Sequence, residues 1–246
     1  MAAVCPVGRP RAGVVCLAAL AWFARTARGQ EAVAGWEGNG TSGYAFARPV
    51  LSLAPASRHQ LIVFATASYL YYRFLDQAGF TRVTSPGIGG SLGYRLNTPS
   101  VTATLAIGYE VRHTTERPKA PPFPVSYGER GPALEGELSL EADPRTEINA
   151  LATWSGADGY GWARAGIARR LTPPRSGART AFSLGGEATF QGNSDVRAWQ
   201  AGPLLVVELL PADASLELRV GLGRTRYTDA PGENRPYFGL TLYRAF

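Results

Sequence analysis

Imidazole chemistry is open to this chain at two positions, His59 and His113, the only histidines among its 246 residues. A hydrolytic site needs a nucleophilic hydroxyl beside an imidazole, which is itself oriented by a carboxylate or an amide. His113 is followed by Thr114 and then by Glu116, so all three group types are close in sequence. Adjacent residues of an extended chain point to opposite faces, however, so the imidazole and the Thr114 hydroxyl would not meet. We therefore predict no catalytic residues.

Metal and thiol chemistry have less support. The two histidines are not at ligand spacing, and the carboxylates are scattered along the chain. Both cysteines, Cys5 and Cys16, lie in an N-terminal segment that we expect to be removed. The sequence therefore predicts no metal site, no cofactor and no disulfide in the mature protein.

The segment 1–29 has the pattern of a cleaved secretory signal peptide. Arg9 and Arg11 precede an apolar stretch at 13–24 that is too short to span a bilayer. Small residues stand at the −3 and −1 positions before Gln30, where we expect cleavage; a buried N-terminal helix is the alternative. Cleavage removes four arginines and no acid, so the net charge falls from +6 to +2. This small excess gives no reason to expect a nucleic-acid partner.

The remaining domain, 30–246, alternates between apolar and polar residues. Between Ser100 and His113, one side carries Val101, Ala103, Leu105, Ile107, Tyr109 and Val111. The same period of two recurs at 133–143, 182–190 and 216–223, which indicates strands with one apolar face. Such segments are longer than the ~5–6 residues common in globular strands, and they match the ~9–11 residues of a tilted membrane-spanning strand. The predicted fold is all-β, a transmembrane antiparallel up-and-down β-barrel.

We predict about 12 strands, with ten as the alternative. They are expected at 31–37, 43–53, 61–74, 87–97, 100–113, 132–143, 145–155, 160–171, 180–191, 195–210, 214–227 and 236–246. Long links at 75–86, 114–131 and 228–235 alternate with short ones, as when short turns face the periplasm and long loops face outside. The strand at 31–37 shows poor alternation of apolar and polar residues. It is included because an up-and-down barrel of this kind has an even number of strands.

The C-terminal strand is expected to carry the assembly signal. It ends at Phe246, and a terminal strand ending in Phe resembles the sorting signal of outer-membrane barrels. Tyr and Trp residues near the predicted strand ends favour contact with the lipid interface, although an ordinary aromatic core is the alternative. We therefore predict an outer-membrane protein of a bacterium with two membranes, with membrane lipid and the barrel-assembly machinery as partners.

Charged residues on the polar side of the strands are predicted to face the lumen. They are Arg95, Glu110, Arg112, Glu135, Glu137, Glu141, Arg164, Glu187, Glu217 and Arg219. Unpaired charge inside a narrow barrel is costly, so we expect pairing across strands. Two interpretations remain open: a cross-braced, largely filled interior, or a small polar pore.

Short motifs in the second half occur in a characteristic order. They are Tyr127–Pro132 with Glu135 and Glu137, Trp162–Gly166, Leu184–Glu187, Gln191–Asp195, Arg197–Gly202, Gly221 and Pro236–Gly239. Together they resemble the cellulose biosynthesis protein BcsS family, over roughly 60–246. The resemblance implies an outer-membrane barrel associated with bacterial cellulose production, with cellulose or cellulose-secretion components as partners. It brings no catalytic residues.

Three functions follow as hypotheses. The favoured one is a non-catalytic accessory barrel of cellulose or exopolysaccharide biosynthesis and secretion. The alternatives are a small porin unrelated to cellulose and an outer-membrane lipid-modifying enzyme. In the first, the Pro-rich loop 114–131 could guide a glucan, because the rings of Phe123 and Tyr127 can stack on sugar faces. The competing interpretation is that the prolines only stiffen an exposed loop.

Overall fold

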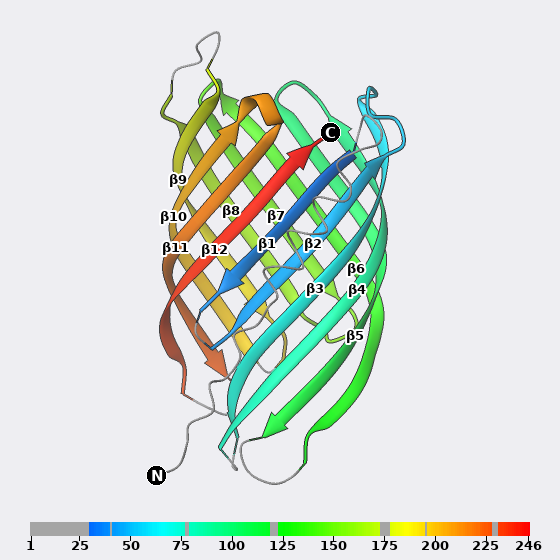
Figure 1. The fold of residues 1–246 in the computed structure, drawn as a ribbon, viewed down its shortest axis with the longest axis vertical. Coiled ribbons are helices and arrows are strands. Elements are labelled where there is room, and N and C mark those ends of the chain that lie inside the picture. The colour runs from blue at the N-terminus through cyan, green and yellow to red at the C-terminus, as the bar shows by residue number, and fades with distance from the viewer. Residues whose placement is uncertain are drawn as a thin grey trace.

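Twelve antiparallel strands form the protein in a computed structural model (Figure 1). The structure describes residues 30–39, 41–76, 79–118, 123–172, 178–194, 196–227 and 231–246, so the predicted signal peptide lies outside the described residues. The strands are β1 (Gln30–Gly38), β2 (Gly43–Ser52), β3 (His59–Asp76), β4 (Gly79–Asn97), β5 (Val101–Pro118), β6 (Val125–Asp143), β7 (Thr146–Ser155), β8 (Gly161–Arg170), β9 (Thr180–Gly192), β10 (Val196–Leu209), β11 (Ala214–Tyr227) and β12 (Glu233–Ala245).

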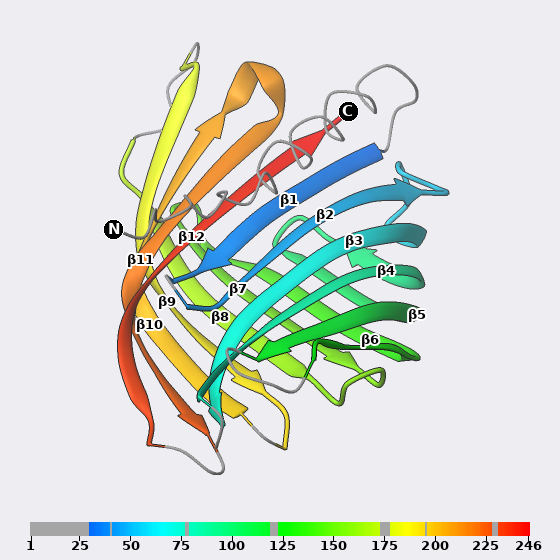
Figure 2. The ribbon, with the colours of Figure 1, turned by 60° about the horizontal axis from the view of Figure 1, so that its bottom comes forward.

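Each strand pairs with its neighbours in sequence, and β1 pairs with β12 to close the barrel. The closing seam places Glu31 opposite Ala245 and Gly38 opposite Phe238. Figure 2 shows the closed ring of strands. The predicted fold class and the count of 12 are confirmed, and the strand predicted from parity alone supplies half of the seam.

The two ends of the barrel differ. Gln30, Phe246 and the short connections after β4, β6 and β10 lie at one end, at the top of Figure 1; we call it the turn end. The connection after β10 is a 3₁₀ turn, Leu210–Ala212, that ends on Asp213 with a left-handed φ of 44°. We call the opposite end the hairpin end. In the described ranges, no helix has the length and apolar character needed to span a membrane.

At the hairpin end, two predicted loops are wrong, because the chain continues as strand. β3 to β6 have 18 or 19 residues each, and Figure 1 shows them reaching beyond their neighbours. Pairing runs to Asp76 opposite Gly79 and to Glu116 opposite Val125, so most of 75–86 and 114–131 is extended hairpin. Proline suggested loops, but Pro86 lies where β4–β5 pairing lapses and then resumes in the same register.

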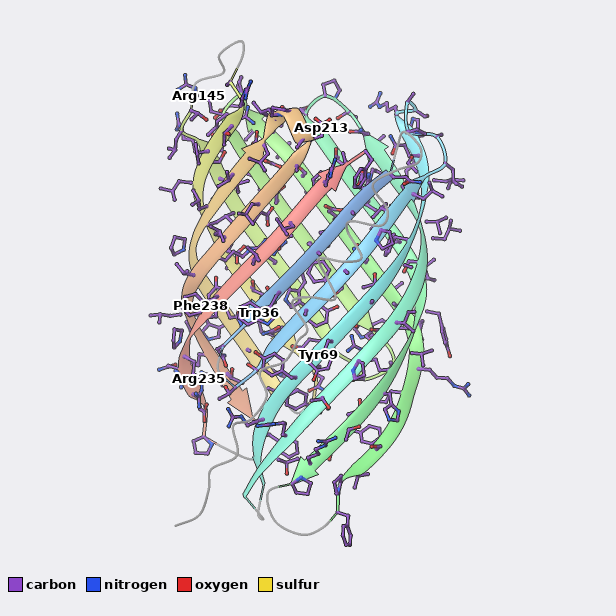
Figure 3. All side chains as sticks on the ribbon, viewed as in Figure 1. Trp36, Tyr69, Arg145, Asp213, Arg235 and Phe238 are labelled. Carbon is purple, nitrogen blue, oxygen red and sulfur yellow. The ribbon has the colours of Figure 1, made fainter. Side chains whose placement is uncertain are left out.

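The outer surface of the barrel is apolar and the inner surface is polar. On β5, Leu105 is 72% exposed on the outside, whereas Thr104 is 2% exposed on the inside. Three outward aromatic residues, Trp36, Tyr69 and Phe238, lie at similar heights about midway along the barrel in Figure 3. Trp162 and Tyr243 instead line the interior. The apolar outer surface is the arrangement that a lipid surrounding requires.

Candidate functional site in the barrel lumen

A cavity of about 370 Å³ lies inside the barrel, and all twelve strands contribute to its lining. Nine of the ten charged residues predicted to face the lumen line this cavity: Arg95, Glu110, Arg112, Glu135, Glu137, Arg164, Glu187, Glu217 and Arg219. The tenth, Glu141, is exposed near the turn end, directly opposite Glu147. The lining also contains uncharged aromatic and aliphatic side chains, so the cavity has both polar and apolar walls.

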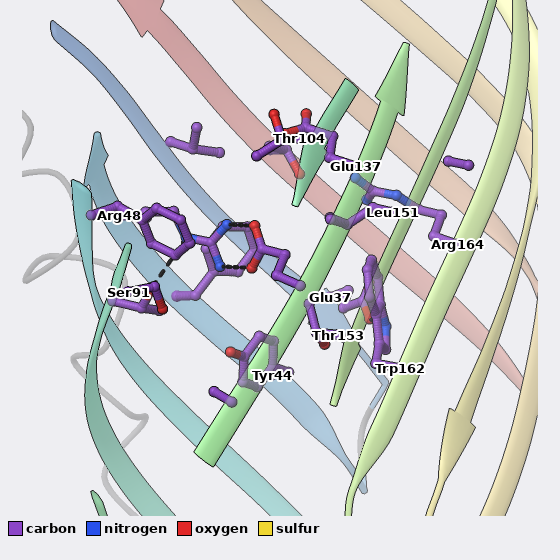
Figure 4. Close-up of a pocket in the computed structure, with 18 of the residues that line it drawn as sticks. Glu37, Tyr44, Arg48, Ser91, Thr104, Glu137, Leu151, Thr153, Trp162 and Arg164 are labelled. Carbon is purple, nitrogen blue, oxygen red and sulfur yellow. Dashed lines mark hydrogen bonds and ion pairs between the residues drawn. The ribbon is translucent and has the colours of Figure 1, made fainter. Parts of the chain in front are cut away.

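One ion pair crosses the middle of the lumen. Arg48 on β2 meets Glu135 on β6 with both terminal nitrogens, and the distance from Nη2 to Oε2 is 2.6 Å. The Arg48 Nε also donates to Thr66 Oγ1 at 3.1 Å, and its guanidinium lies 4.5 Å from the centre of the Phe64 ring. Three strands separate β2 from β6 along the wall, so the pair bridges open space, as Figure 4 shows. We call it the lumen bridge.

A second contact joins strands on opposite sides of the barrel. The Trp162 indole on β8 donates from Nε1 to Glu37 Oε1 on β1 at 2.8 Å. The Arg164 guanidinium lies 5.2 Å from the Trp162 ring, an attractive cation–π contact. Trp162 and Glu37 both lie near the ends of their strands at the hairpin end, so the contact between them narrows the lumen there (Figure 4).

Near the turn end, Arg95 on β4 binds Glu31 on β1 at 2.6 and 3.2 Å. Its Nε donates to Thr104 at 3.2 Å. This pair spans β2 and β3, so it too braces strands that are not neighbours.

The most enclosed polar group centres on Arg219. Its Nε donates to Glu187 at 2.7 Å, its Nη1 donates to Thr241 at 2.7 Å, and its Nη2 binds Glu217. The side chains of Arg219 and Glu187 are each 2% exposed, and the Tyr237 hydroxyl lies 3.4 Å from Glu187. We call this set the wall cluster, because its partners come from β9, β11 and β12 rather than from across the cavity.

Two glycines make room for the wall cluster. A Cβ on Gly239 would lie 3.2 Å from the Arg219 side chain, and one on Gly221 would lie 2.5 Å from the Tyr237 ring. A larger residue at either position would displace these side chains. Glu187, Gly221, Tyr237 and Gly239 all belong to the motifs noted in the sequence, so motifs far apart in the chain meet at one place.

Arg112 is a buried charge in the lumen that is only partly satisfied. It binds Glu110 at 2.7 Å and has Asp158 at 3.9 Å, and its side chain is 7% exposed. Within the described part of the chain, its Nε and Nη1 atoms have no hydrogen-bond partner. These two donors are buried without a hydrogen-bond partner, which is costly unless an ordered water reaches them.

The sequence did not single out Glu31, Glu37, Arg48 or Thr241 as partners, and Tyr237 appeared only as part of the motif Pro236–Gly239. Glu31, Glu37 and Arg48 sit in the first two strands, whose alternation is poor. Thr241 and Tyr237 alternate with apolar Phe238 and Leu240, so period two in the last strand carried a usable signal.

A family model for the cellulose biosynthesis protein BcsS matches residues 28–246. The chain belongs to this family. The resemblance seen in the sequence motifs is therefore confirmed, and it covers nearly the whole predicted mature domain. A search of curated proteins finds no match.

Among solved structures, this BcsS family barrel is similar to transport domains of autotransporters. The β domain of the Bordetella autotransporter BrkA aligns with a TM-score of 0.53 and 12% identity, covering 89% of this chain and 99% of that one. The transport unit of AIDA-I from Escherichia coli aligns with a TM-score of 0.52 and 11% identity, covering 98% and 100%. At such low identity the likeness shows the fold alone, that of an outer-membrane β-barrel.

The histidine-centred set is not assembled in this BcsS family barrel. The Thr114 hydroxyl is buried and contacts Ser85 at 2.9 Å and Glu129 at 2.7 Å, whereas the neighbouring His113 is exposed on the other face of β5. His59 contacts the Tyr94 hydroxyl. Among the described residues, no group of three His, Cys, Asp or Glu side chains could hold a metal ion.

The predicted glycan-contact residues fall in different settings. Phe123 is 89% exposed in the connection before β6. The prediction that Tyr127 lies in a loop is wrong: the residue lies within β6, and its hydroxyl donates to Glu116 at 2.8 Å. Only Phe123 is thus presented on a connecting segment.

Phe246 follows the last residue of β12. Its backbone N–H donates to the Gln30 carbonyl at 2.9 Å, so the final residue still contributes to the seam. The Arg244 guanidinium lies 4.7 Å from the centre of the Phe246 ring. The terminal aromatic ring is therefore held against the barrel.

Proposed function

We propose that this protein is a non-catalytic, accessory outer-membrane barrel of bacterial cellulose biosynthesis. The observation that carries the proposal is the family match over 28–246. An apolar outer surface and the outer-membrane barrel fold support its location in that membrane. Export by the signal peptide 1–29 and insertion by the barrel-assembly machinery, which would recognise the strand ending in Phe246, complete the proposal.

The lumen supports an accessory role better than a role as the polymer's exit. The lumen bridge and the Trp162–Glu37 contact each join strands across the interior. A glucan chain could pass only if both contacts broke. We infer that cellulose or other cellulose-secretion components meet this protein at its hairpin end, outside the barrel.

A passive channel is the second candidate, and one observation favours it. Among the described residues, the cavity lining holds nine carboxylates and five arginines. A water-filled lumen with this excess of negative charge would admit small cations in preference to anions. This function would need no link to cellulose.

A deletion strain tests the favoured function. In a cellulose-producing host, we expect deletion to lower the amount of cellulose made or retained at the surface, measured as glucose released by cellulase. The wild-type gene restores the amount. A deletion strain with unchanged cellulose production and unchanged retention would overturn the proposal.

Planar-bilayer recording separates the two candidates. The wild-type barrel is expected to show little steady conductance, because its lumen is bridged. A steady, cation-selective conductance in every insertion would favour the channel.

An enzymatic assay tests the non-catalytic part. Purified barrel incubated with phospholipid or lipid A is expected to release no product above the background of the heat-unfolded protein. Product formation that disappears in His113→Ala would contradict the proposal.

A further inference from the structure

Three arginines gather on the outer surface of β10 and β11 near the hairpin end. Arg197 on β10 lies directly opposite Arg226 on β11, and Arg224 lies opposite Trp199. All three arginine side chains are exposed. We call them the outer arginine cluster. Like charges directly opposite each other on two strands destabilise the pairing, so this arrangement has a cost unless an anion offsets it.

The described part of the chain does not supply that anion. Across the described ranges, no carboxylate forms an ion pair with any member of the outer arginine cluster. Inside the lumen, by contrast, Arg48, Arg95 and Arg219 each form an ion pair with a carboxylate.

The depth of the outer arginine cluster identifies the environment that could supply the anion. The outward residues of β11, starting from the turn end, are Leu216, Leu218, Val220 and Leu222, followed by Arg224 and Arg226. On β10 the last outward apolar residue before Arg197 is Trp199, which is 49% exposed. The arginines thus begin where the apolar band ends, beside the kind of residue that favours the membrane interface.

We propose that the outer arginine cluster binds phosphate groups of anionic lipids in the leaflet surrounding the hairpin end. Lipid phosphates lie at this depth, just outside the hydrocarbon region. The planar guanidinium groups suit bidentate contact with phosphate oxygens. Three neighbouring cations favour a headgroup that carries more than one phosphate, as a phosphorylated glycolipid does, over a zwitterionic headgroup.

A similar pair lies farther out on the extended hairpins. Arg82 on β4 is directly opposite Arg117 on β5, and both are exposed. Arg117 is three outward positions beyond Val111, so this pair lies beyond the apolar band. It is not needed for the proposed site, but it extends the basic surface at the same end of the barrel.

The test compares the wild type with R197Q/R224Q/R226Q. The matched control is R58Q/R145Q/R179Q, which removes three exposed arginines from the connections at the turn end. Each purified barrel in uncharged detergent is titrated with bisphosphorylated lipid A, with phosphatidylethanolamine or with inorganic phosphate, and the temperature midpoint of unfolding is recorded.

Lipid A is expected to raise the midpoint of the wild type and of the control by about 3 °C or more. The cluster variant should need roughly tenfold more lipid for the same shift. Without lipid, the cluster variant should be at least as stable as the wild type, because it has lost repulsion. This sign separates lost binding from faulty folding.

Three results would overturn the proposal. The first is an equal lipid A response in the cluster variant and the wild type. The second is an equal response of the wild type to inorganic phosphate and to lipid A, which would identify a simple anion site rather than a lipid site. The third is stronger stabilisation by phosphatidylethanolamine than by lipid A.

Discussion

The wall cluster and the lumen bridge are both built from arginine and glutamate and both border the lumen cavity, yet they differ in how enclosed their charges are. In the wall cluster, Arg219 and Glu187 are each 2% exposed, and their partners come from nearby strands. In the lumen bridge, Arg48 and Glu135 are 19% and 10% exposed and come from strands that three other strands separate along the wall. The first pair fixes how β9 to β12 lie together, and the second fixes what fills the lumen.

This difference separates stability from access. Removing one partner of a buried pair leaves an uncompensated charge out of water, which is costly. Removing one partner of a less enclosed pair leaves a charge that water can reach. The wall cluster should therefore govern stability, and the lumen bridge should govern passage.

The largest expected effect breaks the wall cluster. Arg219→Met leaves Glu187 and Glu217 without their cation and should lower the free energy of unfolding by about 3–5 kcal/mol. Urea titration of the barrel in lipid vesicles measures it. Adding Glu187→Gln to Arg219→Met should recover part of the loss. A single variant as stable as the wild type would mean that the cluster contributes nothing to the wall.

A second substitution adds the lipid surface to the comparison. Leu105→Arg places a charge at the middle of the outer face and should cost about 2–4 kcal/mol in the same titration. Asn149→Arg, whose side chain lines the cavity, should cost less because water can reach it. The reverse order would mean that the inner and outer faces are exchanged.

The lumen bridge should yield a smaller loss of stability and a larger change in conductance. Arg48→Gln removes the bridging cation and should cost about 1–2 kcal/mol, since the remaining Glu135 carboxylate borders the cavity. Conductance in planar bilayers should rise, because the contact across the middle is lost. Arg219→Met is the control, and equal conductance in both variants would remove the distinction between wall and bridge.

The smallest effect on stability is expected at the hairpin end, outside both pairs. Phe123→Ala should change the free energy of unfolding by less than about 0.5 kcal/mol, because the ring is exposed. If rings there contact glucan, this variant should bind cello-oligosaccharides more weakly. Tyr127→Phe keeps its ring but loses the bond to Glu116, so it should retain binding. Unchanged binding by Phe123→Ala would leave this segment without a glycan role.

The sequence predicted the strands well where one side of the chain is uniformly apolar. Leu105, Ile107 and their neighbours alternate with polar residues, and a period of two over that length has few other structural explanations. The sequence does not predict the extended hairpins, because proline usually ends a strand. Pro86 and Pro118 instead sit where a ladder hydrogen bond is not required or where the strand ends.

The partners inside the lumen could be predicted only in part. Alternation indicates which charges share a face of the sheet. It does not indicate that Arg48 reaches Glu135 across the barrel, because that contact depends on the diameter of the barrel and on the stagger of its strands. The wall cluster came closer to prediction, because Glu187, Glu217 and Arg219 were all expected inside. Their shared neighbours Thr241 and Tyr237 depend on how β11 and β12 align.

The extended hairpins make the hairpin end of this barrel asymmetric. β3 to β6 extend beyond the other strands on one side of the hairpin end, while the strands on the opposite side end earlier (Figure 1). A large partner that approaches this end is blocked by the extended hairpins on one side and meets only the shorter strands on the other. We expect any partner to approach over the side of the shorter strands, so that it arrives in one orientation. The barrel would then bind a partner in one defined orientation.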